Sequence, residues 1–232
     1  MIAAFIKEHR LFLSFHHAGV GFCSMVTTGT AAWGAVLFAR VHGWSPSQIG
    51  LAEGLALIAG GILGMLGGGA LSDYLSRRGP HMRLVVCVFA GLGAAIAGVS
   101  FPLVDDPNLA IVLLGAVFMF AGMPFGAANA ALQLIAPDAI RGAVSALFFF
   151  SLSMIGGLGP ALIAILSDRW FPTPDGIRFA IAIVIPAASL LAAICYALSV
   201  GPYRRTSVVQ QLNGGVKVTG PSNDGAPAVA DA

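Results

Sequence analysis

The stretch GALSDYLSRR, residues 69–78, places a glycine, a carboxylate and two arginines between two long apolar runs. One run starts near Gln48 and leads into this stretch, and the other follows it. Because charged side chains are unfavourable in hydrocarbon, a charged cluster between two apolar runs is typical of a turn at a membrane surface. The stretch therefore predicts that the chain crosses a membrane both before and after it.

The composition of the whole chain agrees with a membrane protein. Of the 232 residues, 57% are hydrophobic and only 9% are charged, and the mean hydropathy is +0.88. This leaves too little polar surface to cover a water-soluble globule of this size. The apolar blocks are about 20 residues or longer, the length that a helix needs to cross a bilayer, so helices are favoured over a barrel.

Charged, Pro-rich and Gly-rich breaks divide the apolar sequence into six segments, each read as a membrane-spanning helix. The predicted spans are 15–39, 48–71, 83–103, 109–134, 141–167 and 176–199. We expect residues 1–14 to form a cytoplasmic amino-terminal segment, 15–200 the six-helix bundle and 201–232 a disordered cytoplasmic tail, because the tail is rich in small and polar residues without periodicity.

The distribution of basic residues predicts the orientation. One side of the predicted bundle receives nine Lys and Arg residues and the other side receives three. The larger group is Lys7, Arg10, Arg77, Arg78, Arg83, Arg141, Arg204, Arg205 and Lys217, and the smaller is Arg40, Arg169 and Arg178. By the positive-inside rule both termini lie in the cytoplasm, and we expect a multi-pass protein of the plasma (inner) membrane.

A short internal repeat suggests two related halves within the bundle. Leu71-Ser72-Asp73 at the end of the second span recurs as Leu166-Ser167-Asp168 at the end of the fifth, with Gly64 in register with Gly159. The two copies end on opposite sides of the predicted membrane. The sequence therefore predicts an all-α membrane protein of two inverted three-helix repeats.

The turn at residues 69–78 resembles the loop signature Gly-x-x-x-Asp-(Arg/Lys)-x-Gly-(Arg/Lys)-(Arg/Lys) of the major facilitator superfamily. Gly69, Asp73, Arg77 and Arg78 match this signature, while Tyr74 and Ser76 depart from it. The resemblance covers roughly residues 5–200 and is similar to the carboxy-terminal six-helix half of the family, helices seven to twelve. Three further stretches resemble the spinster-like branch, whose members are linked to lipid-like or organic-anion substrates: Trp33 with residues 38–44, Arg141-Gly142, and residues 155–168.

In this family the loop acid takes part in gating, which makes Gly69, Asp73, Arg77 and Arg78 candidate gating residues. We expect Asp73 to pair with Arg77 or Arg78 across the turn. The resemblance also implies that Asp73 faces the amino end of a helix in the opposite half, where the helix dipole favours a negative charge. The alternative is that the arginines only fix the topology.

Glu53 is the only carboxylate well inside a predicted span, about one and a half turns from its outer end. An acid in the membrane must be paired or protonated, so Glu53 is a candidate for proton coupling or for binding a cationic group. The alternatives are that it reaches water or pairs with Arg40. Arg40 itself ends the first span and is a candidate for attracting an anionic solute or for snorkelling to the interface.

Other polar residues inside the spans are candidates for a solute cavity. Thr27 and Thr30 lie in the first span, which lines the cavity in this family, and Asn129 and Gln133 share a face of the fourth span. The alternative for all four is hydrogen bonding between helices. His16 and His17 lie at the cytoplasmic start of the first span, where we expect solvation at the interface; the alternative is a titrating pair.

The sequence thus predicts a secondary transporter of a small organic solute, anionic or lipid-like, that works by alternating access with a second six-helix half supplied by a separate chain or by a homodimer. The alternative is a truncated or non-transporting membrane scaffold. No protease or Walker motif is present, so an enzyme is not expected. We expect no cofactor, no metal site and no nucleic-acid partner, since Cys23, Cys87 and Cys195 lie apart in apolar segments.

Overall fold

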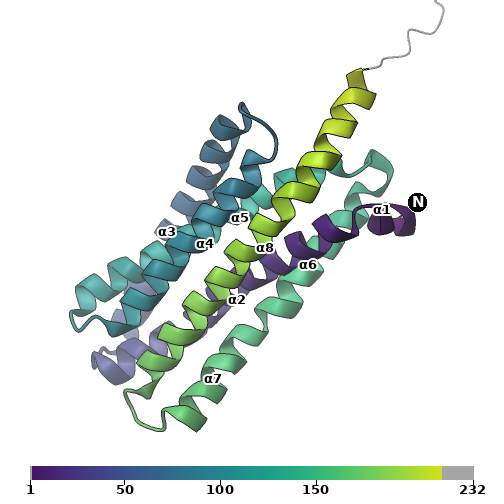
Figure 1. The fold of residues 1–232 in the computed structure, drawn as a ribbon. Coiled ribbons are helices and arrows are strands. Elements are labelled where there is room, and N and C mark those ends of the chain that lie inside the picture. Colours follow the sequence, from purple (N-terminus) through teal and green to yellow (C-terminus); the bar gives the residue numbers. More distant parts are fainter. Residues whose placement is uncertain (1, 216–232) are drawn as a thin grey trace, which may run out of the picture.

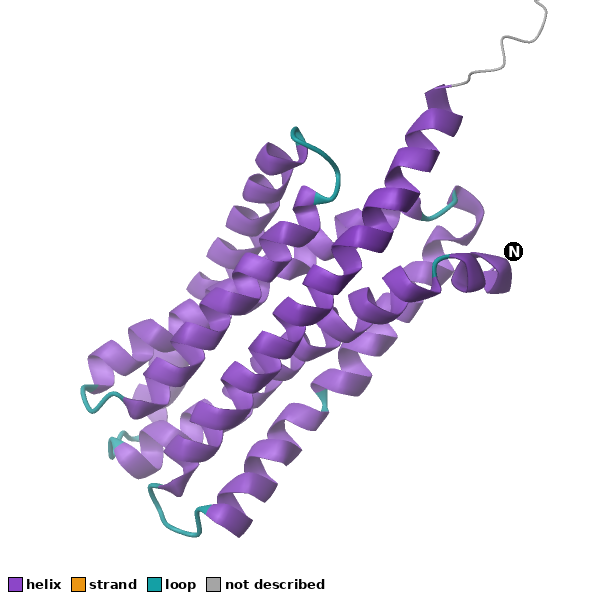
Figure 2. Ribbon diagram, in the orientation of Figure 1, coloured by secondary structure: helices purple, strands orange, loops and turns teal. Residues whose placement is uncertain are grey.

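The computed structural model describes the backbone of residues 2–215 and the side chains of residues 2–206. Helices joined by short turns make up this part of the chain, and it contains no strand (Figure 2). In chain order the elements are α1 (Ile2–Glu8), α2 (Arg10–Val41), α3 (Pro46–Ser76), α4 (Met82–Leu103), α5 (Pro107–Ile135), the 3-10 helix η1 (Asp138–Ile140), α6 (Arg141–Gly156), α7 (Leu158–Trp170) and α8 (Gly176–Gly215).

Six segments are long and apolar enough to cross a membrane, which confirms the predicted number of spans. Five of them are α2, α3, α4, α5 and α8, and the sixth runs from η1 through α6 and α7. α3 begins at Pro46, two residues before the predicted span: Ser45 and Gln48 form a reciprocal capping box and Pro46 occupies the first turn.

The spans alternate in direction along the bundle. Figure 1 shows the amino terminus, the turn after α3, the α5–α6 connection and the far end of α8 at one end of the bundle. The turns after α2, α4 and α7 lie at the opposite end. We call these the Asp73 end and the Asp168 end, because the two aspartates of the repeated sequence lie near them.

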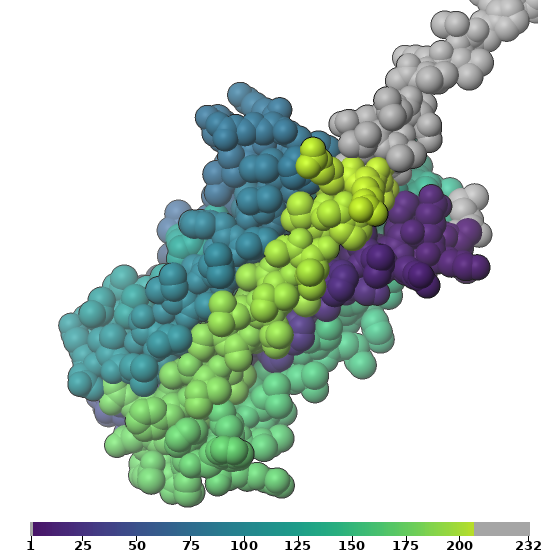
Figure 3. All heavy atoms as spheres, in the orientation of Figure 1, coloured from purple at the N-terminus to yellow at the C-terminus, as the bar shows by residue number. Residues whose placement is uncertain are grey.

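The core is formed where α8 packs between α2 and α4, and α8 crosses the visible face between α4 and the α6–α7 span (Figure 3). The largest fully buried side chains are mostly aromatic, including Phe12, Phe38, Phe101, Tyr196 and Tyr203. By contrast, α3 and the α6–α7 span are the least buried of the six. The bundle is therefore well packed around α2, α4 and α8 and open along two spans.

Glycine contacts give the two three-helix units the inverted symmetry that the sequence predicts. Gly64 of α3 lies against the carbonyl oxygen of Met119 on α5, and Gly159 of α7 lies against the carbonyl oxygen of Met25 on α2. In both cases the second span of one unit meets the first span of the other at a methionine backbone. These matched contacts allow the backbones to approach closely, as small residues do between membrane helices.

The fifth span is interrupted, whereas the sequence predicted one continuous helix at 141–167. Pro160 has no N–H to donate to the carbonyl of Gly156, so that carbonyl is free for another donor. Thr28 Oγ1 donates to it at 2.6 Å, and Trp33 Nε1 donates to the carbonyl oxygen of Pro160 at 2.9 Å. Two side chains of α2 therefore stabilise the break between α6 and α7.

The prediction of a disordered tail from residue 201 is wrong for its first part. α8 continues to Gly215, and the buried Tyr203 packs on Phe12 with ring centroids 5.2 Å apart. Burial of this aromatic ring favours the helical conformation over a free chain. The rest of the predicted tail, residues 216–232, lies outside the described residues. At the other terminus, residues 2–14 contribute α1 and the start of α2.

The contact between Gly64 and Met119 gives a direct test of the packing. We predict that Gly64→Val destabilises the bundle by about 1–3 kcal/mol, because an added side chain would push α3 away from the α5 backbone. Gly67→Val is the matched control, since Gly67 lies on the same helix with open space around it. Thermal unfolding in detergent would measure both, and equal losses for the two variants would contradict the packing.

Candidate functional site

The loop motif lies partly on a helix rather than wholly in a turn. α3 continues to Ser76, so Gly69 and Asp73 are helical, and the turn proper is residues 77–81. Gly79 has a φ of +143°, a conformation that favours glycine. The turn is therefore short and fixes where α4 starts relative to Asp73.

Asp73 pairs with Arg83 of α4, at 3.5 Å between Oδ1 and Nη2. The expectation that Arg77 or Arg78 would be its partner is wrong. Because α3 remains helical up to Ser76, Arg77 and Arg78 extend past the end of the helix, and the guanidinium of Arg77 lies over the ring of Tyr74 at 5.8 Å. The carboxylate is exposed while Arg83 is mostly covered, so one oxygen of Asp73 can still meet another group.

Glu53 lies inside the α2–α3 contact near the Asp168 end. Its Oε1 is 2.7 Å from the position that a Cβ would occupy at Gly34, so the carboxyl group fits only because α2 has a glycine there. Oε1 is buried and has no hydrogen-bond partner in the described residues. Arg40 is exposed in the last turn of α2 and forms no ion pair with Glu53. The predicted alternative of a Glu53–Arg40 pair is therefore wrong.

The basic residue that is engaged at the Asp168 end is Arg178, which the sequence reasoning missed. It donates from Nε to the carbonyl of Pro102, and from Nη2 to the carbonyl of Leu103 and to Asp105 Oδ1, each at 2.8 Å. These bonds hold the end of α4 to the start of α8. Burial of the ring is the main cause that lowers the pKa of His42 at this end, and the nearby positive charge of Arg178 lowers it further. The acidic turn at 105–108 was a signal for a cationic partner.

A mostly apolar cavity of about 360 Å³ lies between α2, α3 and α5. Of the predicted cavity residues it contains Thr27, whose Oγ1 donates to the carbonyl of Cys23 at 3.2 Å. Its other lining residues are Leu57, Ile58, Gly61, Ile62, Met65, Phe118, Gly122 and Phe125. Thr30 is fully buried outside this lining, and its hydroxyl has no partner. The cavity therefore suits apolar groups with one hydroxyl at its edge.

Asn129 and Gln133 share a face of α5, as predicted from their spacing. Gln133 Nε2 donates to Asn129 Oδ1 at 3.4 Å and also to Ser145 Oγ on α6. They lie outside the cavity lining and join α5 to α6. This arrangement agrees with the alternative of hydrogen bonding between helices, although Gln133 Oε1 is buried without a partner.

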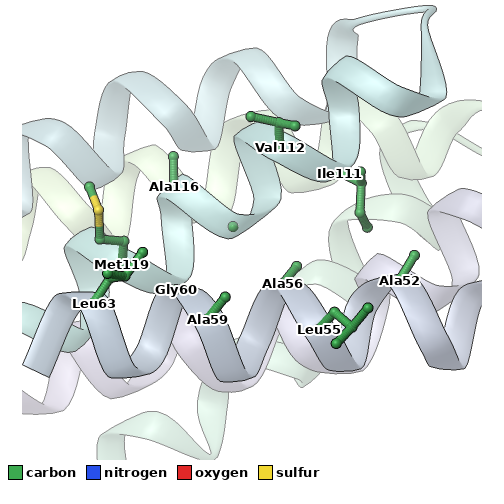
Figure 4. A pocket seen from close by; sticks show the side chains of 11 residues that line it. Ala52, Leu55, Ala56, Ala59, Gly60, Leu63, Ile111, Val112, Ala116 and Met119 are labelled. Atoms are coloured by element: carbon green, nitrogen blue, oxygen red, sulfur yellow. The ribbon is translucent and has the colours of Figure 1, made fainter.

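A second apolar hollow, of about 590 Å³, runs between α3 and α5 toward the Asp168 end. Ala52, Ala56 and Ala59 of α3 and Ile111 and Ala116 of α5 are among the residues that line it (Figure 4). Small side chains on both helices leave this space, and no polar side chain lines it. Among the described residues, no three His, Cys, Asp or Glu side chains are placed to hold a metal ion.

Comparison with known proteins found one similar curated sequence. The chain is 30% identical over 192 residues to a protein described as an MFS-type efflux pump from Mycolicibacterium smegmatis, where MFS denotes the major facilitator superfamily. The alignment covers 81% of this chain and 44% of the relative, so the chain spans less than half of the relative's length. No family model matches the chain.

Two solved structures have the same fold. Both are crystal structures of a bacterial homologue of the human lysosomal transporter Spinster, inward-facing and either unoccupied or occupied. Their TM-scores are 0.65 and 0.61 at 18% and 20% identity, over 90% and 85% of this chain and 50% and 49% of theirs. The fold is thus that of one six-helix half of a major facilitator superfamily transporter, which confirms the resemblance seen in the loop.

The ion pair at the Asp73 end predicts a specific coupling. A double-mutant cycle of Asp73→Asn with Arg83→Gln should show an interaction energy of up to about 1 kcal/mol, because the pair is close but one partner is exposed. The same cycle with Arg78→Gln should show none. Unfolding in detergent would provide the measurement, and coupling to Arg78 alone would contradict the geometry.

Proposed function

We propose that this chain, which has the fold of one half of a major facilitator superfamily transporter, works with a second six-helix bundle as a secondary transporter of a small organic or lipid-like solute. The observation that carries the proposal is the sequence similarity to an efflux pump along most of the chain, together with the inverted six-helix fold. The relatives are transporters, and two bundles that alternate in access are typical of transporters with this architecture.

The second bundle is proposed to cover α3 and the α6–α7 span, the two least buried spans. On the outer half of α3, Gly50, Gly54 and Gly61 lie on one side of the helix, and a Cβ at any of them would meet no atom within 4 Å. Open glycines on a membrane helix allow another helix to approach closely. A separate chain or a second copy of this one could supply this bundle.

The solute is proposed to be anionic or lipid-like and to bind between the two bundles. The cavity at Thr27 gives one wall that is mostly apolar, which suits the hydrocarbon part of such a solute. Arg40 remains exposed at the Asp168 end and is free of any ion pair in the described residues, so it can attract an anionic group. Thr30, Asn129 and Gln133 are proposed to contribute polar contacts when the bundles move.

Asp73 is proposed to act in gating at the Asp73 end, with Gly69, Arg77 and Arg78 forming the rest of the loop. Its exposed carboxylate keeps one side available for the amino end of a helix in the second bundle, where unpaired N–H groups favour a negative charge. Arg83 then holds the carboxylate in place. Release of this contact would accompany the change in access.

Glu53 is proposed to carry the coupling proton or to bind a cationic group of the solute. Its buried Oε1 lacks a donor, so the carboxylate form leaves a charge without compensation inside the α2–α3 contact. A proton or a cation would provide that compensation. A change in access that moves α3 relative to α2 would alter how easily Glu53 takes up either one.

We propose that the Asp73 end faces the cytoplasm and that the protein resides in the plasma membrane. Most of the basic residues lie at this end, including Arg77, Arg78, Arg83 and Arg141. Such an excess of Lys and Arg near short loops sets the orientation of membrane proteins.

Replacement of the loop acid should stop transport without unfolding the bundle. We predict that Asp73→Asn lowers solute uptake at least about tenfold, a loss of about 1.4 kcal/mol in the balance between access states, while unfolding stays nearly unchanged. Asp138→Asn is the matched control, because Asp138 is an exposed carboxylate paired with Arg141 at the same end. Uptake into liposomes that contain both bundles would test this.

Equal uptake by wild type and Asp73→Asn would contradict the gating role. A folded protein that takes up no solute with any second bundle would instead favour a non-transporting scaffold.

Replacement of the intramembrane acid should separate binding from coupling. We predict that Glu53→Gln still exchanges solute across the membrane but no longer accumulates it against a gradient, because the amide cannot gain or lose a proton. The measurement is counterflow compared with concentrative uptake in liposomes, with Glu8→Gln outside the bundle core as the control. Unchanged accumulation by Glu53→Gln would exclude a role in proton coupling.

A further inference from the structure

Two adjacent histidines are buried near the Asp73 end, contrary to the expectation that they would be solvated at the interface. His16 is fully buried and His17 is nearly so. His16 Nε2 lies 3.0 Å from the carbonyl oxygen of Ala128 on α5, and His17 Nδ1 lies 2.7 Å from the carbonyl oxygen of Leu13. Because carbonyl oxygens only accept, each of these nitrogens carries a proton, and the other nitrogen of each ring is the basic one.

Both basic nitrogens, His16 Nδ1 and His17 Nε2, are buried without a hydrogen-bond partner. The rings of Phe12, Phe148 and Tyr196 surround His16, with centroids 5.0, 5.9 and 6.1 Å away. The two imidazoles are 5.5 Å apart, so a positive charge on one ring disfavours a positive charge on the other. An unpartnered buried nitrogen is an unusual feature that calls for a functional account.

Little surrounds the pair that could compensate a positive charge. The elements packed on His16 contribute no carboxylate: α5 has no ionisable side chain, and α6 has only Arg141 in its first turn. The titratable groups in this region come from three helices: His17 and Cys23 from α2, Cys87 from α4, and Cys195, Tyr196 and Tyr203 from α8. Arg83 of α4 lies nearer to Tyr203. An added proton therefore finds no counter-charge while the helices remain packed.

The hydrogen bond from His16 to the carbonyl oxygen of Ala128 joins α2 to α5. Its acceptor, Ala128, lies in the part of α5 beyond Pro124. Pro124 lacks the N–H of a regular helix turn, and Gly122 and Gly126 flank it, which makes this region of α5 a candidate hinge. We call residues 125–135, beyond Pro124, the α5 arm. The arm contains both Asn129 and Gln133.

A pocket at the Asp73 end comes close to the pair. It has a volume of about 370 Å³, lies between the start of α2 and α8, and includes the polar residues Glu8, His9, Arg10 and Thr206 in its lining. Phe12 also lines this pocket, and the same ring lies against His16. One aromatic side chain therefore separates His16 from a pocket with titratable walls.

We propose that His16 and His17 form a proton-operated latch that holds the α5 arm against α2. While both rings are neutral, His16 donates to Ala128 and the arm stays closed. A proton that enters past Phe12 binds the free Nδ1 of His16, and the uncompensated charge favours an arrangement in which the arm moves away and water reaches the rings. The latch thereby makes the position of Asn129 and Gln133 depend on pH at the Asp73 end, and it requires no transported solute.

The test uses the full chain in lipid nanodiscs with spin labels at Leu11→Cys on α2 and Leu134→Cys on the α5 arm, both exposed positions. Cys195→Ala removes the one cysteine that is not fully buried. Pulsed electron spin resonance then measures the distance between the labels at about pH 8 and about pH 5.5, on either side of the ordinary histidine pKa of about 6.5. Acid should increase a longer-distance population at least about fivefold, a change that corresponds to about 1 kcal/mol.

His16→Gln should abolish this response, because its amide can still donate to Ala128 but cannot take up a proton. His81→Gln, in the turn after α3, is the matched control and should respond like the wild type. A pH response retained in His16→Gln, or no response in the wild type, would overturn the latch. If His16→Gln does not fold, nitrogen NMR of the wild-type imidazoles can report their protonation instead. If both rings stay neutral at about pH 5.5, that result would also overturn the latch.

Discussion

Close approach of helix backbones at glycine is the constraint on which the rest of this structure depends. In a bilayer the lipid tails are as apolar as the side chains, so burial alone gives helices little reason to associate. Gly64 against Met119 and Gly159 against Met25 bring α3 onto α5 and α7 onto α2. The cavity at Thr27, the place of Glu53 against Gly34 and the break in the α6–α7 span all follow from helices held this closely.

The same packing makes the bundle unequal around its circumference. α2, α4 and α8 share aromatic and aliphatic core residues, whereas α3 and the α6–α7 span have few buried residues of their own. A bundle of this kind can satisfy its backbone hydrogen bonds alone, because each helix satisfies them internally. The open spans explain why a second bundle is proposed for transport.

The sequence predicted the helices but not the partners of their polar groups. Apolar length and the positions of charged turns depend on local composition, so six spans and the loop motif could be recognised. The pairing of Asp73 with Arg83, the bond from Thr28 to Gly156 and the burial of His16 each join segments whose contact depends on tertiary packing. The helix beyond residue 201 was missed for the same reason, because Tyr203 packs on Phe12 at the other end of the chain.

The most direct test of the account is the mass of the complex that this chain forms in a lipid bilayer, measured together with solute uptake by the same sample. Only complexes with two six-helix bundles should take up solute, whether the second bundle is another copy or a separate chain. A single copy that transports solute by itself would contradict the account.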